Sequence, residues 1–184
     1  MFKVIKINTD SQLIRQSLQN NRQAQKQLYD KYASKMLSLC SYYVKDSQRA
    51  EEVMLNGFLK VFTKLDQFAN KGSFEGWIRK IMVFECISFL RKKNRLVFTD
   101  QIERLEDVVE NEIELSIAVD DLHNYINELP EGCKIIFNMY VIEGYKHAEI
   151  AEILNLSVGT SKTQLYRARK SLQKMISRHQ KKVL

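Results

Sequence analysis

Apolar residues recur at helical spacing through the first half of this chain, and this periodicity constrains the fold more than any other feature. Two runs carry the pattern: Leu28, Tyr32, Met36, Leu39 and Tyr43, then Val53, Phe58, Val61, Phe62 and Leu65. Turn formers are scarce, with six Gly and one Pro among 184 residues, whereas residues that favour helix are abundant. We therefore expect an all-α protein.

The pattern predicts three long helices over residues 21–44, 47–68 and 73–94, after a short leading helix. Asp46 or Ser47 can cap the second of them. Gly72 permits a turn before the third, which Ser73 can cap. Together these helices predict a helical domain over residues 8–97.

The following segment is acidic and poor in apolar residues. The window from Asp100 to Asp121 holds nine acids and one base, so the remainder of a chain of net charge +7 sums to +15. We predict a linker over residues 98–116 and a second small helical domain over 117–184. Two basic ends around an acidic middle indicate a polyanion held at two places, with nucleic acid the leading candidate. The alternative for any single charged run is a solvated helix face.

In the second domain, Pro130 marks a helix start and Gly144 the end of that helix. The segment HAEIAEILNL then predicts a short helix, although Lys146 stands where a capping residue is expected. SVGT follows as a tight connection in which Ser157 can cap the next helix. This is the pattern of a helix-turn-helix.

We expect the outer face of the last helix to carry positive charge only. From Ser157 to Leu184 the chain has eight Lys or Arg residues and no acid. The inward side is predicted to carry Val158, Ser161, Leu165, Ala168, Leu172 and Ile176, and the outward side Thr163, Tyr166, Arg167, Lys170 and Lys174. Such a face fits the major groove of DNA, the alternative being an amphipathic packing helix with a soluble face.

A second cluster mixes aromatics with cations in GSFEGWIRKIMVFECISFLRKKNR, where only Glu75 and Glu85 are acidic. This mixture suits the stacking of unpaired bases beside a phosphate track. Core aromatics at helical spacing are the alternative.

On three segments in order, the chain resembles a bacterial RNA polymerase sigma factor of the extracytoplasmic function (ECF) group of the sigma-70 family. The segments are SQRAEEVMLNGFLKVFTKLDQF, then GSFEGWIRKIM with SFLRKKNR, then INELPEGCKIIFNMYVIEGYKHAEIAEILNLSVGTSKTQLYRARKSL. The resemblance covers roughly residues 10–177. It implies a first domain that binds core polymerase and opens the minus 10 element, and a helix-turn-helix domain that reads the minus 35 element.

The resemblance assigns three sets of residues. The polymerase set, expected to grip the clamp helices of the largest subunit, is Glu51, Glu52, Asn56 and Leu59. The minus 10 set is Phe74, Trp77, Arg79, Lys80, Phe84, Arg91 and Lys92. The minus 35 set is Lys162, Thr163, Tyr166, Arg167, Lys170 and Lys174. The partners implied are core polymerase and promoter DNA, together with an anti-sigma protein of the kind that commonly holds family members.

Three positions in the first domain depart from the family pattern. Phe84 replaces the Asn that many members use at the flipped base, and a phenyl ring can stack but cannot read a base edge. Asn56 and Gly57 replace the usual Gln and acid, and a glycine within a helix costs about 0.5 to 1 kcal/mol relative to alanine.

Other functions are less consistent with the residues. A stand-alone helix-turn-helix regulator is the nearest alternative, but it gives no reason for the aromatic and basic cluster. We find no catalytic constellation, since His123, His147 and His179 have no spaced carboxylate partners. Cys40, Cys86 and Cys133 show no metal-ligand spacing and are predicted to be buried thiols. We expect a cytoplasmic protein, because the chain shows neither a signal peptide nor a membrane span. We also expect that it holds no cofactor or metal.

Overall fold

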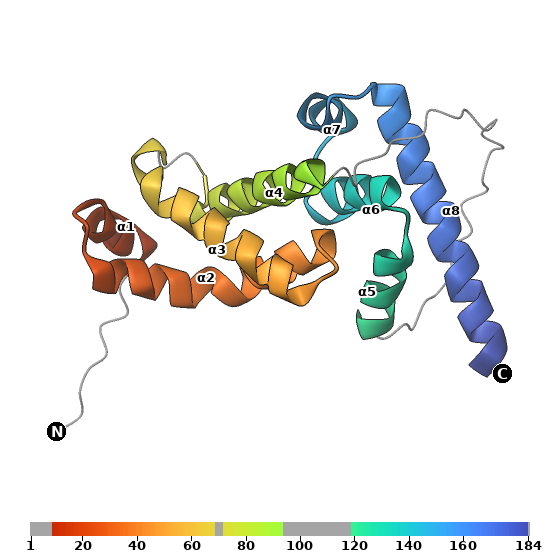
Figure 1. The fold of residues 1–184 in the computed structure, drawn as a ribbon, viewed down its shortest axis with the longest axis horizontal. Helices are drawn as coiled ribbons and strands as arrows, with labels where there is room; N and C mark the ends of the chain where they lie inside the picture. Colours follow the sequence, from red (N-terminus) through yellow and green to blue (C-terminus); the bar gives the residue numbers. More distant parts are fainter. Residues whose placement is uncertain (1–8, 69–71, 94–118, 184) are drawn as a thin grey trace. The chain divides into compact units, whose positions relative to one another are not determined.

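The computed structural model describes residues 9–68, 72–93 and 119–183, and in these residues every regular element is helical (Figure 1). The all-α prediction is confirmed. The chain divides into two compact units, Met1–Phe89 and Leu90–Leu184. The predicted linker, residues 98–116, and the start of helical spacing near Ile117 lie outside the described residues.

The first unit contains α1 (Asp10–Leu18), α2 (Arg22–Tyr43), α3 (Ser47–Thr63), a 3₁₀ turn η1 (Leu65–Gln67) and most of α4 (Phe74–Lys92). The predicted caps form, because the Arg49 N–H donates to the Asp46 carboxylate at 3.1 Å and the Gly76 N–H donates to Ser73 Oγ at 2.9 Å. The predicted helix 47–68 instead ends at Thr63. There the Thr63 hydroxyl donates to the Leu59 and Lys60 carbonyls, in competition with the backbone.

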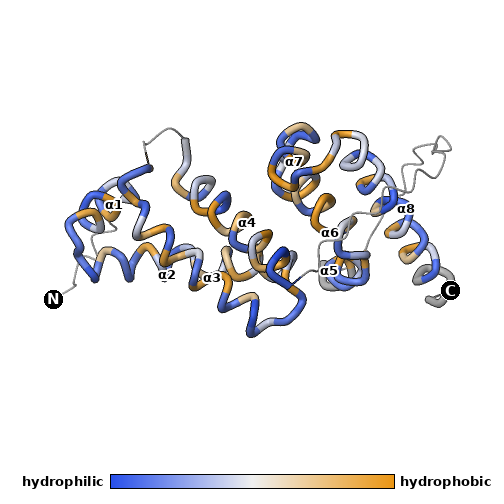
Figure 2. Tube along the Cα trace, turned by 45° about the horizontal axis from the view of Figure 1, so that its top comes forward, coloured by the Kyte–Doolittle hydropathy of each residue, from blue (hydrophilic) through white to orange (hydrophobic). Residues whose placement is uncertain are grey.

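The core of this unit consists of the apolar faces of its helices, which alternate with polar faces along the chain (Figure 2). Met36, Cys40, Ile78 and Met82 are fully buried within it. Gly57 explains the closeness of two of these helices, because a Cβ at this position would collide with Met82 Sδ. The glycine that is unfavourable by helix propensity is therefore what lets α3 approach α4.

The second unit contains α5 (Val119–Glu128), α6 (Glu131–Phe137), a π-helical turn η2 (Asn138–Ile142), α7 (His147–Leu154) and α8 (Val158–Val183). The expected break falls at Pro130, directly before α6. Gly144 follows η2 with a φ of 76°, the left-handed conformation that glycine adopts without strain. Helix α8 packs against α6 and α7 to form the core of this unit.

The turn between α7 and α8 is tightly specified. Asn155 adopts a left-handed φ of 55°, the Leu156 N–H donates to the Ala151 carbonyl at 3.0 Å and the Asn155 N–H donates to the Glu152 carbonyl at 3.3 Å. This pattern is a Schellman motif. Ser157 then caps α8 by accepting from the Thr160 N–H at 2.9 Å, as expected. The predicted helix-turn-helix is present.

Candidate nucleic-acid and polymerase interfaces

Helix α8 buries its apolar side much as the periodicity predicts. Ser161, Leu165, Ala168, Leu172 and Ile176 are buried. Val158 is the exception, with 42% of its surface exposed. The expectation that it lies on the inward side is wrong because it is the first residue of the helix, before the segment that α6 and α7 cover.

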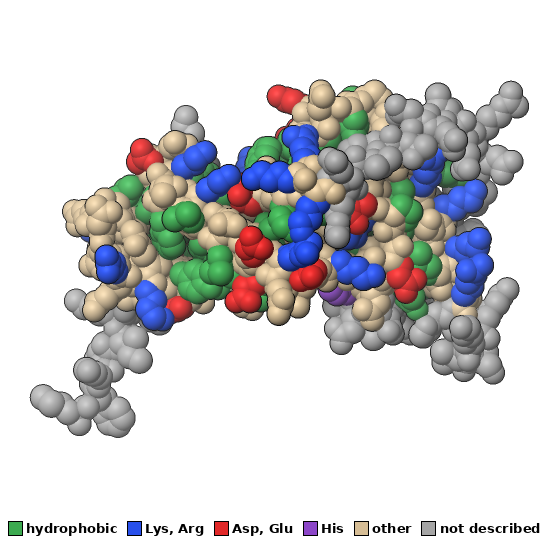
Figure 3. Space-filling view, viewed as in Figure 1, with side chains coloured by type: hydrophobic (Ala, Val, Ile, Leu, Met, Phe, Trp, Pro, Cys, Tyr) green, Lys and Arg blue, Asp and Glu red, His purple; other side chains and the backbone are tan. Residues whose placement is uncertain are grey.

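The minus 35 set lies on the outer surface of α8. Lys162, Lys170 and Lys174 are exposed, whereas Thr163, Tyr166 and Arg167 are half-buried. The Lys170 ammonium lies 6.0 Å from the centre of the Tyr166 ring, at the outer limit of a cation–π contact. Lys and Arg side chains follow the course of α8 at the right edge of Figure 3.

Gln164 belongs to α8 but not to its outer face. Its side chain is 4% exposed, and its Oε1 lies 2.9 Å from Cys133 Sγ on α6. Burial raises the pKa of the Cys133 thiol, against the opposing effect of the Arg167 charge, so the thiol stays protonated and donates a hydrogen bond to Gln164 Oε1. Apolar periodicity did not predict this hydrogen bond, because glutamine is a polar residue type that is usually found on the surface.

A second tie joins α7 to α8. His147 Nδ1 lies 2.8 Å from Ser161 Oγ, and the imidazole ring stacks on Tyr140 at a centroid distance of 4.4 Å. Partial burial lowers the pKa of His147, and the charges of Lys162 and Arg169 lower it further. Both effects favour the neutral form of the imidazole.

The cap that Lys146 lacks is supplied in another way. Its backbone N–H donates to the Glu149 carboxylate at 2.7 Å, which is one half of a capping box. The other half cannot form, because an ammonium group has no lone pair to accept from the backbone. Glu149 also places a negative charge in the first turn of α7, where the helix dipole favours it.

The polymerase set lies on one exposed face of α3. Glu51, Glu52 and Asn56 are exposed, and Leu59 is 63% exposed. Leu55, one turn before Leu59, is 49% exposed and was not singled out from the sequence. Its sequence signal is its position, because Leu55 lies outside the core stripe of α3 and four residues before Leu59, a second apolar residue outside that stripe.

The aromatic residues at the start of α4 form a packed cluster. Phe74 is buried, with its ring 5.8 Å from that of Trp77 in a stacked arrangement and 5.1 Å from that of Phe68 edge to face. The Phe68 and Trp77 rings are 5.5 Å apart. Trp77 itself is half-buried, so part of its ring is accessible.

The rest of the minus 10 set lies farther along α4. Phe84 is 45% exposed. Arg79 is half-buried, whereas Lys80, Arg91 and Lys92 are exposed.

Both acids of this segment are paired with lysines from neighbouring helices. Glu75 lies 2.9 Å from Lys35 of α2, and Glu85 lies 2.5 Å from Lys60 of α3. The acids of α4 are thereby neutralised.

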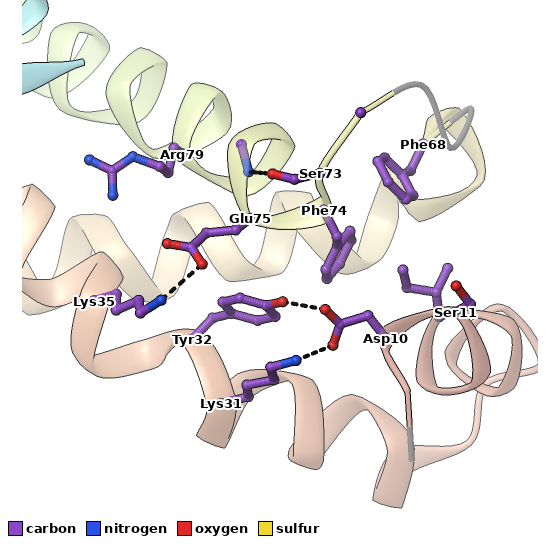
Figure 4. A pocket seen from close by; sticks show the side chains of 13 residues that line it. Asp10, Ser11, Lys31, Tyr32, Lys35, Phe68, Ser73, Phe74, Glu75 and Arg79 are labelled. Carbon is purple, nitrogen blue, oxygen red and sulfur yellow. Dashed lines mark hydrogen bonds and ion pairs between the residues drawn. The ribbon is translucent and has the colours of Figure 1, made fainter. Parts of the chain in front are cut away.

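A groove of about 570 Å³ opens beside the aromatic cluster, between α1, α2 and the start of α4 (Figure 4). Phe74 and Arg79 of the minus 10 set line it, together with Phe68. At its far side the Asp10 carboxylate accepts from Lys31 at 2.5 Å and from the Tyr32 hydroxyl at 2.6 Å. Aromatic rings and cations therefore share one concave surface.

The three cysteines are free and buried, as predicted. Among the residues whose side chains are described, no group of three or more His, Cys, Asp or Glu residues could hold a metal ion. No helix in the described ranges is long and apolar enough to cross a membrane.

Fold and surface together define an all-helical protein with a basic helix-turn-helix in one unit and an aromatic, basic helix in the other. Two family models match the chain: sigma-70 region 2 over residues 28–96 and sigma-70 region 4 over residues 120–172. RNA polymerase sigma factor SigV of Bacillus subtilis is 32% identical over 133 residues, which cover 71% of this chain and 78% of that protein. An ECF RNA polymerase sigma-E factor of Haemophilus influenzae is 26% identical over 185 residues, covering 91% and 95%.

A solved structure shares the fold. It is the structure of sigma factor RpoE in complex with the anti-sigma factor NepR from Bartonella quintana. The matched chain is 22% identical in sequence, the match covers 83% of this chain and 96% of that chain, and the TM-score is 0.55.

The chain belongs to the sigma-70 family, in its extracytoplasmic function group. It is therefore an RNA polymerase sigma factor, which binds core polymerase and directs promoter recognition and DNA melting. The stand-alone regulator is not supported, because a match to region 2 accompanies the helix-turn-helix.

Proposed function

We propose that the two helical units divide the work of promoter recognition. The domain over residues 8–97 binds core polymerase through α3 and the opened minus 10 strand through α4. The domain over residues 117–184 reads the minus 35 element through α8, and the acidic segment 98–116 links them. The protein acts in the cytoplasm by binding alone, without catalysis of its own.

The observation that carries this proposal is the exposed pair Leu55 and Leu59 on α3. Single exposed apolar residues are ordinary, but two on adjacent turns form a patch that a partner can bury. Glu51, Glu52 and Asn56 surround the pair with polar groups, the usual arrangement at the edge of a protein interface. A stand-alone DNA-binding protein has no need of such a face, whereas a sigma factor must hold the polymerase.

Helix α4 is suited to hold unpaired bases. Phe74 and Phe68 pack against Trp77 and orient its half-buried ring, and Phe84 offers a second, exposed ring. Stacking of a base on an aromatic side chain contributes about 1 to 3 kcal/mol. We assign Phe74 to the support of Trp77 rather than to contact with a base, because it is buried.

The groove beside this cluster extends the same surface. Its volume is in the range of pockets that hold small ligands, and the half-buried Phe68 ring and the cations that line it match a base and its phosphate. We assign it to an unpaired nucleotide next to the one on Trp77. The two acids that line the groove, Asp10 and Glu75, are paired with Lys31 and Lys35, which favours this assignment because the pairing weakens their repulsion of a phosphate.

The minus 35 set is arranged for duplex DNA. An α-helix fits the major groove, where Arg and Lys reach guanine edges and Thr or Tyr contact neighbouring bases. Because Gln164 and Ser161 tie α8 to α6 and α7, the outer face keeps a constant orientation.

We also assign an anti-sigma partner to this protein. Support comes from the RpoE structure that shares its fold and contains NepR. A protein that covers the polymerase set or the minus 35 set would keep the factor inactive until it is released.

The test is run-off transcription with bacterial core polymerase and genomic DNA fragments from the source organism, with and without this protein. We expect new transcript starts that share two spaced upstream elements. Double substitution Leu55→Ala with Leu59→Ala should abolish them while the protein remains folded by circular dichroism. Tight binding of the free protein to defined duplex sites, without new starts, would instead support a stand-alone regulator.

A further inference from the structure

His147 occupies the joint between the two helices of the helix-turn-helix. It is the first residue of α7, its Nδ1 is hydrogen-bonded to Ser161 Oγ at 2.8 Å, and its ring stacks on Tyr140 of η2. Ser161 is fully buried. The ring is therefore held in one orientation from two sides, and it was assigned no role from the sequence.

Two positive charges act on the His147 imidazole. From α8 these are Lys162 and Arg169, both exposed, and from η2 the facing group is the uncharged Tyr140. On its own helix, the Glu149 carboxylate is engaged by the Lys146 backbone N–H. Burial and the two cations lower the pKa of His147. The local environment thus disfavours a third positive charge and favours an anion.

We propose that His147, Lys162 and Arg169 form a phosphate-binding cluster, and that docking on a promoter duplex adds a proton to His147. This inference rests on the proposed role of α8 at the minus 35 element and names three contacts of that site. Of the three residues, only Lys162 belongs to the minus 35 set.

The geometry explains how the cluster would bind a phosphate. Nδ1 is engaged with Ser161, so Nε2 is the ring atom assigned to a phosphate oxygen. Lys162 directly follows Ser161, and Arg169 lies on the same side of α8 two turns later. Three cationic groups from two helices would then converge on the DNA backbone, which positions the helix in the groove without reading sequence.

The sign of the pH dependence follows from this arrangement. A phosphate beside the imidazole stabilises its charged form, so the pKa of His147 is higher in the complex than in the free protein. Affinity for DNA therefore rises as pH falls through the bound-state pKa, and becomes independent of pH below the free-state pKa. Between the two values the change approaches about tenfold per pH unit, the limit for one proton.

The experiment measures binding of the reconstituted holoenzyme to a promoter duplex found by mapping transcript starts, by fluorescence anisotropy between pH 5.5 and 8. The wild type is compared with His147→Asn, which keeps a polar group near the Nδ1 position but cannot be protonated. His123→Asn is the control, since His123 lies on α5 beside Asn127. We expect the variant at His147 to lose the pH-dependent part of the affinity and the control to retain it. Equal pH dependence in all three proteins would overturn the proposal.

A second measurement tests the cation. Arg169→Gln should reduce the slope of log affinity against log salt concentration by about 0.9, the value for one phosphate contact. An unchanged slope would remove Arg169 from the cluster.

Nuclear magnetic resonance of the wild-type protein supplies a readout that does not depend on variants. The pKa of the His147 ring should rise when duplex is added to saturation, and a constant value at saturation would contradict proton uptake. If instead Arg167→Ala leaves affinity unchanged at every pH, the role of α8 itself fails, which is a distinct outcome.

Discussion

Met82 fills the space that a Cβ atom on Gly57 would occupy. Gly57 is in the middle of α3 and Met82 is fully buried in α4. The two helices that carry the polymerase set and the minus 10 set are therefore packed together at a position where one has no side chain.

This contact predicts that Gly57→Ala has opposite effects on stability in the wild-type protein and in the Met82→Ala variant. Gly57→Ala alone should lower the free energy of unfolding by about 1 kcal/mol, because an overpacking cost of about 1 to 3 kcal/mol exceeds a helix propensity gain of about 1 kcal/mol. In a Met82→Ala background the same change should be stabilising, since the cavity accepts the methyl group. Urea denaturation of the four proteins measures the cycle. Destabilisation in both backgrounds would show that another neighbour limits the space.

The exposed leucines of α3 predict a loss of binding without a loss of stability. Leu59→Ala should weaken affinity for core polymerase about tenfold or more, as expected of an apolar residue buried in an interface. Unfolding free energy should change by no more than about 0.5 kcal/mol, because the side chain is exposed. Leu18→Ala is a matched control, since Leu18 is 48% exposed on α1. Equal effects of the two variants on polymerase affinity would argue against the α3 face.

Trp77 should matter more for melting than for polymerase binding. Trp77→Ala removes one stacking contact of about 1 to 3 kcal/mol, so the fraction of open complex should fall about fivefold or more. Trp77→Phe should retain much of the activity because a ring remains. Permanganate reactivity of unpaired thymines measures the opening. Normal reactivity in a folded Trp77→Ala protein would show that this ring does not hold a base.

Two cations of the minus 35 set should have different effects. If Arg167 reads a base edge, Arg167→Ala should cost about 1 to 3 kcal/mol on the preferred upstream element and relax sequence preference there. If Lys170 contacts phosphate, Lys170→Ala should weaken binding to all sequences about equally and reduce the salt slope. Lys26→Ala on α2 removes the same charge elsewhere and should change neither. Identical profiles for both α8 variants would contradict this division.

Asp10 should make stability depend on pH at the acidic end. Burial opposes ionisation of its carboxyl, but hydrogen bonds from Lys31 and Tyr32 outweigh it and lower the pKa of Asp10 below 3.8. The stabilisation is then present above 3.8 and is lost as pH falls through the folded-state pKa. Asp10→Asn should therefore be less stable than wild type at pH 7, and the difference should shrink below pH 3.8. A constant difference would show that the charge of Asp10 contributes nothing.

The local features of this protein were predictable because each depends on neighbours in the chain. The positions of α2 and α4, the caps at Asp46, Ser73 and Ser157, and the inward face of α8 all follow from spacing or from side chains within a few residues. The three buried cysteines follow from their apolar neighbours. The order of the three family segments likewise identified the sigma-70 family.

What only the tertiary structure decided is which residues a neighbouring helix covers. Phe74 and Phe84 have the same side chain in one helix, yet one is buried under Tyr32, Phe68 and Trp77 and the other is 45% exposed. Gln164 is buried because α6 places Cys133 opposite it, and Val158 is exposed because nothing in the described part of its unit covers the start of α8. Periodicity assigns a residue to a face of its own helix, but burial depends on contacts between segments far apart in sequence.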